Sequence, residues 1–164
     1  MTADLAGNAR DLREPGPAGR SRAHAGEWSE PARRTLGGVK EVVIRADVPA
    51  PSLPFSAGIK ANGFVFSSGQ VGTDPRTGQV AGPDVAAQTR QAIENLRAVL
   101  EAGGSSLQRL VKTTVFLNDM RLFEQMNAVY REMIPEPRPG RSTVEVRLAR
   151  PELLVEIEGV GVVD

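Results

Sequence analysis

Two charged residues near the end of the chain have side chains from which a small-molecule site could be built. The first, Arg141, follows a run rich in proline and glycine, 137–140, and begins a segment, 142–146, in which apolar and polar residues alternate. An arginine keeps its charge at any working pH and offers a planar fork of donors that fits a carboxylate in bidentate fashion. We therefore expect Arg141, aimed rigidly from the end of a strand, to hold a small carboxylate.

The second residue, Glu156, lies in another alternating segment, 155–158. A glutamate carboxylate can act as a general base when partial burial moves its pKa toward neutrality. Together the two residues predict a site in which Arg141 anchors an acid and Glu156 handles water or a proton beside it.

Structural roles compete with this prediction. Arg141 could form an ion pair with Glu136 or with the carboxyl terminus, and Glu156 could form one with Arg147 or Lys112. The motifs in which the two residues stand favour the site, more strongly for Arg141 than for Glu156.

The composition excludes several other kinds of chemistry. The chain of 164 residues has no cysteine, so disulfides, thiolate nucleophiles and sulfur-based zinc sites are absent. Its single histidine, His24, lies in a segment without predicted structure, which argues against histidine metal sites and Ser-His-Asp triads. We expect no metal. The formal net charge is zero, so bulk charge favours neither nucleic acid nor an anionic membrane as a partner.

The length allows one ordinary domain with a tail. Residues 1–39 are rich in glycine, alanine and arginine and keep no helical or strand period, so they predict a disordered extension. The alternative is that the true start lies near Gly38-Val39. The domain is then 40–164. No apolar run is long enough to cross a bilayer and no signal peptide is evident, which predicts a cytoplasmic protein.

The domain begins with three predicted strands, 41–45, 55–60 and 64–68. The turn Asn62-Gly63 between the second and third strands is a strong hairpin signal. The following segment, 69–78, is predicted as a loop because it contains Asp-Pro and Thr-Gly turn sequences.

Two helices follow. Asp84 is the expected N-cap of the first, whose apolar residues recur at spacings of three and four up to Leu100, and Gly103-Gly104 ends it. A strand is expected at 111–117, with Val111, Val115 and Leu117 on one face. Asn118 or Asp119 is the expected cap of the second helix, whose apolar stripe is Met120, Phe123, Met126, Tyr130 and Met133. The last strands are 143–148 and 154–163.

This order contains two strand-helix-strand units, which imply parallel strands joined by right-handed crossovers. If both crossovers advance in the same direction, both helices cover one face of a mixed six-stranded sheet. The other face would then carry Thr143, Glu145 and Arg147 from one strand and Glu156, Glu158, Val160 and Val162 from another. A second copy of the chain could cover this face, which would place the polar residues between subunits.

Several motifs resemble the RidA (YjgF/YER057c/UK114) family of reactive-intermediate deaminases, in order and over residues 40–163. They are Ser67-Ser68-Gly69-Gln70, the run 84–92, Asn95-Leu96, the run 111–117, Asn127-Ala128-Val129-Tyr130, the run 141–146 and the run 155–158. The resemblance implies a chorismate-mutase-like α+β fold and a homotrimer with a central barrel and clefts between subunits. It also implies hydrolysis of enamines and imines of the 2-aminoacrylate type to 2-keto acids and ammonia, without a cofactor.

The resemblance assigns roles to single residues. Arg141 stands at the position that binds the substrate carboxylate, and Glu156 at the position that orients the hydrolytic water. Ser68, Gly69 and Asn127 match other positions of the cleft.

Three residues depart from the family pattern. Phe55 stands where many members carry a cleft tyrosine, so the apolar wall remains but a hydroxyl donor is lost. Thr143 replaces a cysteine of some members, and Gly140 replaces a common alanine. These differences concern substrate preference more than the carboxylate anchor. Two alternatives therefore stay open: a non-catalytic carboxylate-binding or regulatory trimer, and deamination of a different acid such as an aromatic-ring catabolite.

Overall fold

Strands and helices alternate along the domain as an α+β fold. The computed structural model describes residues 40–48 and 52–163, and the predicted extension at 1–39 lies outside them. The elements are β1 (Glu41–Val43), β2 (Gly58–Ala61), β3 (Phe64–Ser67), β4 (Gln70–Val71), α1 (Val85–Ala102), β5 (Leu110–Leu117), α2 (Phe123–Met133), β6 (Gly140–Glu145) and β7 (Val155–Val162), with 3₁₀ turns at Leu107–Arg109 and Met120–Leu122.

One mixed sheet in the described part of the chain contains all seven strands, in the order β1-β2-β3-β7-β5-β6, with β4 paired to β7 beside β3. The pairs are antiparallel except β5 with β6, which are joined through α2. The expected α+β class and mixed sheet are confirmed. The sheet has one strand more than predicted, because the segment expected to be a loop pairs Gln70 and Val71 with Ile157 and Glu156 at the start of β7.

The β2–β3 hairpin forms as predicted. Asn62 and Gly63 both adopt positive φ angles, 48° and 78°, which a two-residue turn of this hand requires. The turn sets the register in which Ile59 opposes Phe66.

The first helix also forms as its sequence predicts. The Asp84 side chain accepts a hydrogen bond from the Ala87 amide, and Gly103 and Gly104 end the helix, Gly104 with φ of 85°. Residues at spacings of three and four form its buried side: Val85, Gln88, Thr89, Ala92, Ile93, Asn95, Leu96, Val99 and Leu100.

Two details of the next elements differ from prediction. Asp119 caps the 3₁₀ turn at Met120–Leu122 and not α2, so Met120 is 40% exposed and lies outside the apolar stripe of α2. Val111 is 47% exposed, because an irregularity between Leu110 and Lys112 interrupts the pairing of β5 with β7.

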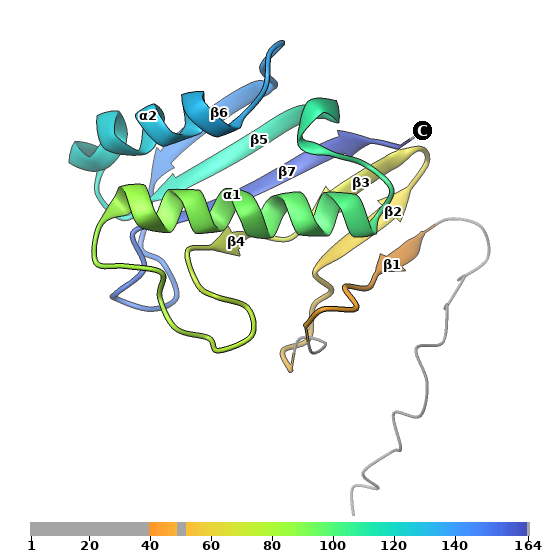
Figure 1. Cartoon of the computed structure of the whole chain (residues 1–164), viewed down its shortest axis with the longest axis horizontal. Coiled ribbons are helices and arrows are strands. Elements are labelled where there is room, and N and C mark those ends of the chain that lie inside the picture. The colour runs from red at the N-terminus through yellow and green to blue at the C-terminus, as the bar shows by residue number, and fades with distance from the viewer. Residues whose placement is uncertain (1–39, 49–51, 164) are drawn as a thin grey trace, which may run out of the picture. The chain divides into compact units, whose positions relative to one another are not determined.

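Both helices lie on the same face of the sheet, as expected, and the core fills the space between them and the sheet (Figure 1). The other face has no covering element among the described residues. It carries Glu156, Glu158, Val160 and Val162 from β7, as predicted.

The prediction for β6 was wrong by one residue in phase. The strand begins at Gly140, directly after Pro139, and pairs Arg141 with Thr113 and Thr143 with Val115. Both partners are buried under the helices, so Arg141, Thr143 and Glu145 lie on the helix side of the sheet. Arg147 lies beyond the end of the strand.

Candidate functional site

The guanidinium of Arg141 lies against two aromatic rings of α2. Its central carbon is 4.5 Å from the centre of the Tyr130 ring and 5.6 Å from that of Phe123. Both distances are within the range of about 6 Å in which a cation is attracted to a ring face. No residue in the described part of the chain forms an ion pair with Arg141, and Glu136 pairs with Arg138 instead. The fork of Arg141 is therefore positioned without a counter-ion.

A buried hydrogen bond fixes the ring below the arginine. Tyr130 is only 3% exposed, and its hydroxyl lies 2.7 Å from the Thr113 hydroxyl on β5. Burial raises the pKa of the Tyr130 phenol, so the ring stays neutral beside the cation. The strand, the helix and the hydrogen bond between them thus form a rigid support for Arg141.

Two other predicted site residues lie near this support. Asn127 is four residues after Phe123 and three before Tyr130, so helical spacing places it on the same side of α2. Thr143 follows Arg141 by two positions on the same side of β6, and its hydroxyl oxygen is buried without a hydrogen-bond partner among the described residues. A ligand carboxylate bound by Arg141 would supply an acceptor for that hydroxyl.

Glu156 belongs to a second group on the other side of the sheet. It pairs with Phe116 of β5 and with Val71 of β4. Its carboxylate lies so close to Gly69 that a Cβ atom at Gly69 would overlap the Oε1 atom of Glu156. Only glycine at position 69 leaves room for the carboxylate.

The surroundings of Glu156 suit a group that takes up protons. Burial raises the pKa of Glu156, and the negative charge of Glu158 raises it further. Neither Lys112 nor Arg147 pairs with it, and Lys112 donates a hydrogen bond to Ser142 instead. No donor in the described part of the chain satisfies the carboxylate.

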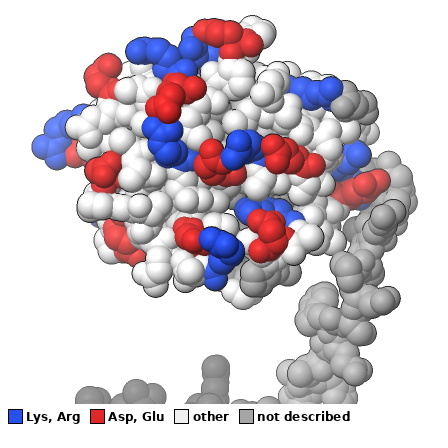
Figure 2. Space-filling model, in the orientation of Figure 1, with Lys and Arg blue, Asp and Glu red and all other residues white. Residues whose placement is uncertain are grey.

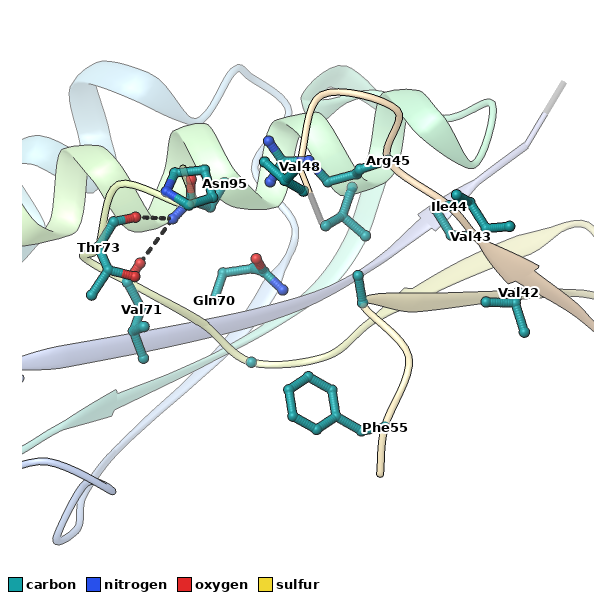
Figure 3. A pocket seen from close by; sticks show the side chains of 14 residues that line it. Val42, Val43, Ile44, Arg45, Val48, Phe55, Gln70, Val71, Thr73 and Asn95 are labelled. Atoms are coloured by element: carbon teal, nitrogen blue, oxygen red, sulfur yellow. Dashed lines mark hydrogen bonds between the residues drawn. The ribbon is translucent and has the colours of Figure 1, made fainter. Parts of the chain in front are cut away.

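Ser68 precedes Gly69 in the chain, and Phe55 lines the same cavity as Gly69. The Ser68 hydroxyl donates a 2.6 Å hydrogen bond to the Ser56 carbonyl, so in this chain it closes the local turn. Phe55 is 52% exposed and lines, with Gly69, a cavity of about 260 Å³ (Figure 3). The structure therefore brings Phe55, Ser68 and Gly69 together with Glu156.

The two groups of predicted residues do not meet within one chain. The first group, Arg141 with its neighbours, lies on the helix side at edge strand β6, whereas the carboxylate of Glu156 lies on the opposite face at β7. Strand β5 separates the two strands. A small substrate bound to one chain could not touch both groups.

Comparison with known proteins assigns the chain to a family. Residues 45–163 match the family model described as Endoribonuclease L-PSP. The chain is 44% identical over 123 residues to a RutC family protein of Pyrococcus horikoshii, an alignment that covers 75% of this chain and 98% of the relative. The chain belongs to the RidA family.

Other relatives within the RidA family carry functional names. A 2-iminobutanoate/2-iminopropanoate deaminase of Salmonella typhimurium is 38% identical over 127 residues, which cover 76% of this chain and 98% of the relative. The family thus includes imine deaminases.

Solved structures of the RidA family confirm the predicted fold. The YjgF gene product of E. coli superposes with a TM-score of 0.68 at 35% identity, over 74% of this chain and 97% of that one. The E. coli protein TdcF, solved with bound serine, gives a TM-score of 0.69 at 31% identity, over 75% and 98%.

Sequence reasoning placed Phe123 and Tyr130 in the core and overlooked their contact with Arg141. The spacing of Phe123, Asn127 and Tyr130 on one side of α2 was visible in the sequence. Whether this side of α2 belongs to a site depends on which face of the sheet carries Arg141. The predicted phase of β6 had placed Arg141 on the opposite face.

The charged side chains outside these two groups form no large patch of one sign on the face shown in Figure 2. Basic and acidic side chains alternate over the face shown in Figure 2, and a bidentate pair between Arg90 and Glu132 joins α1 to α2. Exposed pairs of this kind contribute little to stability.

In the described ranges no cluster of three or more acidic or histidine side chains is arranged to hold a metal ion. None of the helices described has the length and hydropathy of a membrane span.

Proposed function

We propose that this protein hydrolyses 2-imino acids and their enamine tautomers, such as 2-aminoacrylate, to 2-keto acids and ammonia. The enamine takes a proton at carbon and becomes the imine. Water then adds to the imine carbon, the carbon–nitrogen bond breaks, and ammonia leaves. Because the starting compound is already reactive, the protein has only to hold the acid end and to orient water.

The observation that carries the proposal is the unpaired, positioned guanidinium of Arg141. A stacked arginine without a counter-ion among the described residues is prepared to form charge-assisted bidentate bonds to a carboxylate. Asn127 and Thr143 lie at the same place and add polar groups. The deaminase names of relatives support the same chemistry.

Glu156 is the proposed group that positions the attacking water. Its raised pKa makes the carboxylate a better proton acceptor than an ordinary glutamate, and no donor in the described part of the chain occupies it. Gly69 leaves the space in which the carboxylate sits, and Phe55 supplies an apolar wall beside it.

The site is proposed to form between two copies of the chain in a homotrimer. Arg141 of one copy would meet Glu156 of the next, because the two residues face away from each other within a single chain. The uncovered sheet face, with Phe64, Phe66 and Val162 at 36–45% exposure, supplies an apolar surface for the association.

Turnover is tested with 2-aminoacrylate generated in situ, by the rate of pyruvate and ammonia release. Arg141→Ala should lose substrate binding, and Glu156→Gln should lose turnover while it still binds a 2-keto acid. Full turnover by Glu156→Gln would overturn the role of Glu156. If the wild type binds a keto acid but does not accelerate imine hydrolysis, the non-catalytic binding protein is favoured. Phe55, which lacks a hydroxyl, is the residue that supports this alternative.

Mixing the two inactive variants tests the shared site. In subunits exchanged at equal amounts, about one quarter of the interfaces combine an intact Arg141 with an intact Glu156, so about a quarter of the wild-type activity should return. A mixture that stays inactive, although mass spectrometry shows mixed oligomers, would place both residues in a site within one chain.

The family model's endoribonuclease description suggests RNA cleavage as a second assay. The zero net charge and the alternation of charges in Figure 2 give a polyanion no continuous basic surface on that face. We expect no cleavage of single-stranded RNA under conditions in which 2-aminoacrylate is hydrolysed.

A further inference from the structure

An apolar cavity lies beside the Glu156 group and has no part in the chemistry above. It has a volume of about 260 Å³ and opens between β1, the start of β4 and the middle of α1 (Figure 3). Its apolar lining comes mainly from Val42, Val43, Ile44, Val48, Phe55, Ala57, Val71, Pro75 and Val99.

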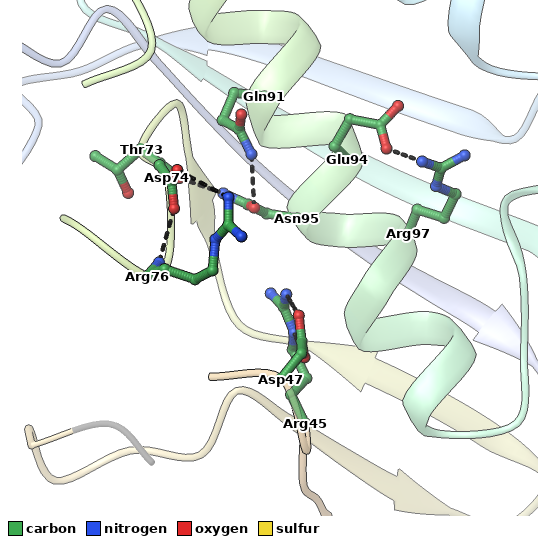
Figure 4. A network of polar contacts seen from close by, with 9 residues as sticks. All are labelled: Arg45, Asp47, Thr73, Asp74, Arg76, Gln91, Glu94, Asn95 and Arg97. Carbon is green, nitrogen blue, oxygen red and sulfur yellow. Dashed lines mark hydrogen bonds and ion pairs between the residues drawn. The ribbon is translucent and has the colours of Figure 1, made fainter. Parts of the chain in front are cut away.

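The charged side chain and an amide in the cavity wall already have partners. Arg45 is held by Asp47 through two hydrogen bonds of 2.6 and 3.1 Å. The Asn95 amide donates to the carbonyls of Val71 and Thr73 and accepts from Gln91 (Figure 4). An apolar group that enters this cavity would therefore not leave the Arg45 charge or the Asn95 amide without a hydrogen-bond partner.

The cavity and the proposed reaction site share one residue. Gly69 lines the cavity, and the Glu156 carboxylate occupies the space next to the same glycine. Phe55 lines the cavity with half of its surface exposed (Figure 3). Gly69 thus brings the cavity next to the place proposed for the imine carbon.

We propose that this cavity receives the substrate side chain, and that the protein acts on 2-imino acids with bulky apolar side chains, branched aliphatic or aromatic. The inference rests on the proposed function. The cavity is smaller than the range of about 300–1,000 Å³ that is usual for whole ligands, so it fits a side chain and not a complete metabolite. Phe55 supplies an aromatic wall without a hydroxyl that would need a polar partner.

The wild-type protein tests this directly. An L-amino acid oxidase generates the imines of alanine, leucine and phenylalanine in situ, and the loss of imine that semicarbazide can trap measures hydrolysis. We expect the apparent kcat/KM for the leucine or phenylalanine imine to exceed that for the alanine imine by on the order of ten-fold or more, as apolar pockets discriminate by about 10–200-fold per methylene.

Filling the cavity should remove the preference. Ala57→Leu places three additional carbons in the cavity wall, and Val48→Phe fills it from the loop after β1. Each should lower the ratio of leucine-imine to alanine-imine kcat/KM by about ten-fold. Ala98→Leu adds the same group to a half-buried alanine of α1 outside the cavity and should leave the ratio unchanged.

The outcomes separate the two proposals. If no imine is hydrolysed, the proposed function fails. If the alanine imine is hydrolysed as fast as the larger ones, the cavity inference alone fails. The inference is also overturned if folded Val48→Phe keeps the wild-type ratio, since the cavity would then be filled by another part of the chain or by a neighbouring copy.

Discussion

At the scale of single residues, Glu156 shows a conflict between stability and chemistry. Its carboxylate is half-buried, has no donor among the described residues and lies near the like charge of Glu158. Burial of an unpaired carboxylate favours the protonated form, so the pKa of Glu156 in the folded protein lies above that in the unfolded chain. A group useful as a base at neutral pH is thus costly to the fold.

This conflict predicts a pH-dependent gain in stability for Glu156→Gln. Because the folded pKa is raised, the wild type loses stability as the pH rises from the ordinary glutamate value through the folded pKa. The glutamine variant has no such loss, so its Tm should exceed that of the wild type at neutral pH and match it below pH values near the ordinary glutamate pKa. Calorimetry over this pH range is the measurement.

Glu158→Gln is the matched control. It removes the second cause of the raised pKa and leaves Glu156 in place, so it should give a smaller gain in Tm and move the acid side of the pH–activity profile to lower pH. A neutral-pH Tm of Glu156→Gln below that of the wild type would show that the carboxylate has a stabilising partner.

At the scale of elements, Asn95 joins α1 to β4, the short strand that pairs with β7 at Glu156. It is 6% exposed and donates to the carbonyls of Val71, which ends the strand that pairs with Glu156, and of Thr73 just after it. The helix therefore determines where β4 lies, and β4 determines where Gly69 and the carboxylate meet.

Asn95→Ala should destabilise the fold by about 1–3 kcal/mol, because two carbonyls lose their donor in a buried place. Gln91→Ala is the control, since it removes only the contact to the Asn95 side-chain oxygen and should cost less. Urea unfolding monitored by circular dichroism compares the two. Equal losses would mean that the carbonyls of Val71 and Thr73 find other donors.

At the scale of the whole molecule, both helices lie on one face of the sheet, and no other described element covers the opposite face, where apolar side chains lie near Glu156 and Glu158. Phe64 and Phe66 lie there with their ring centres 6.2 Å apart, beside Val160 and Val162. The proposed homotrimer would cover this face and complete the divided site at the same time.

Phe66→Glu should therefore abolish assembly and activity together while the subunit stays folded. A charge at the centre of a buried interface is left without a partner and costs several kcal/mol. Light scattering and circular dichroism measure mass and folding. Ala128→Glu, on the exposed side of α2, introduces the same charge and should keep both assembly and turnover. A wild-type protein that is monomeric and active would contradict the divided site.

The elements that local chemistry controls were predictable from the sequence. The Asp84 cap, the Gly103-Gly104 end of α1 and the Asn62-Gly63 turn all depend on residues close together in the chain, and all formed as predicted. The choice of Arg141 and Glu156 depended likewise on side-chain type and on neighbouring residues.

Only the tertiary structure decided how these parts face each other. A strand shifted by one residue turns every side chain to the opposite face, and the pairing of Arg141 with Thr113 depends on a strand far away in the sequence. The same holds for β4, which exists only because β7 is beside it. The sequence therefore determined which residues are proposed to hold an acid and to move a proton, whereas the sheet register decided that one chain presents them on opposite faces.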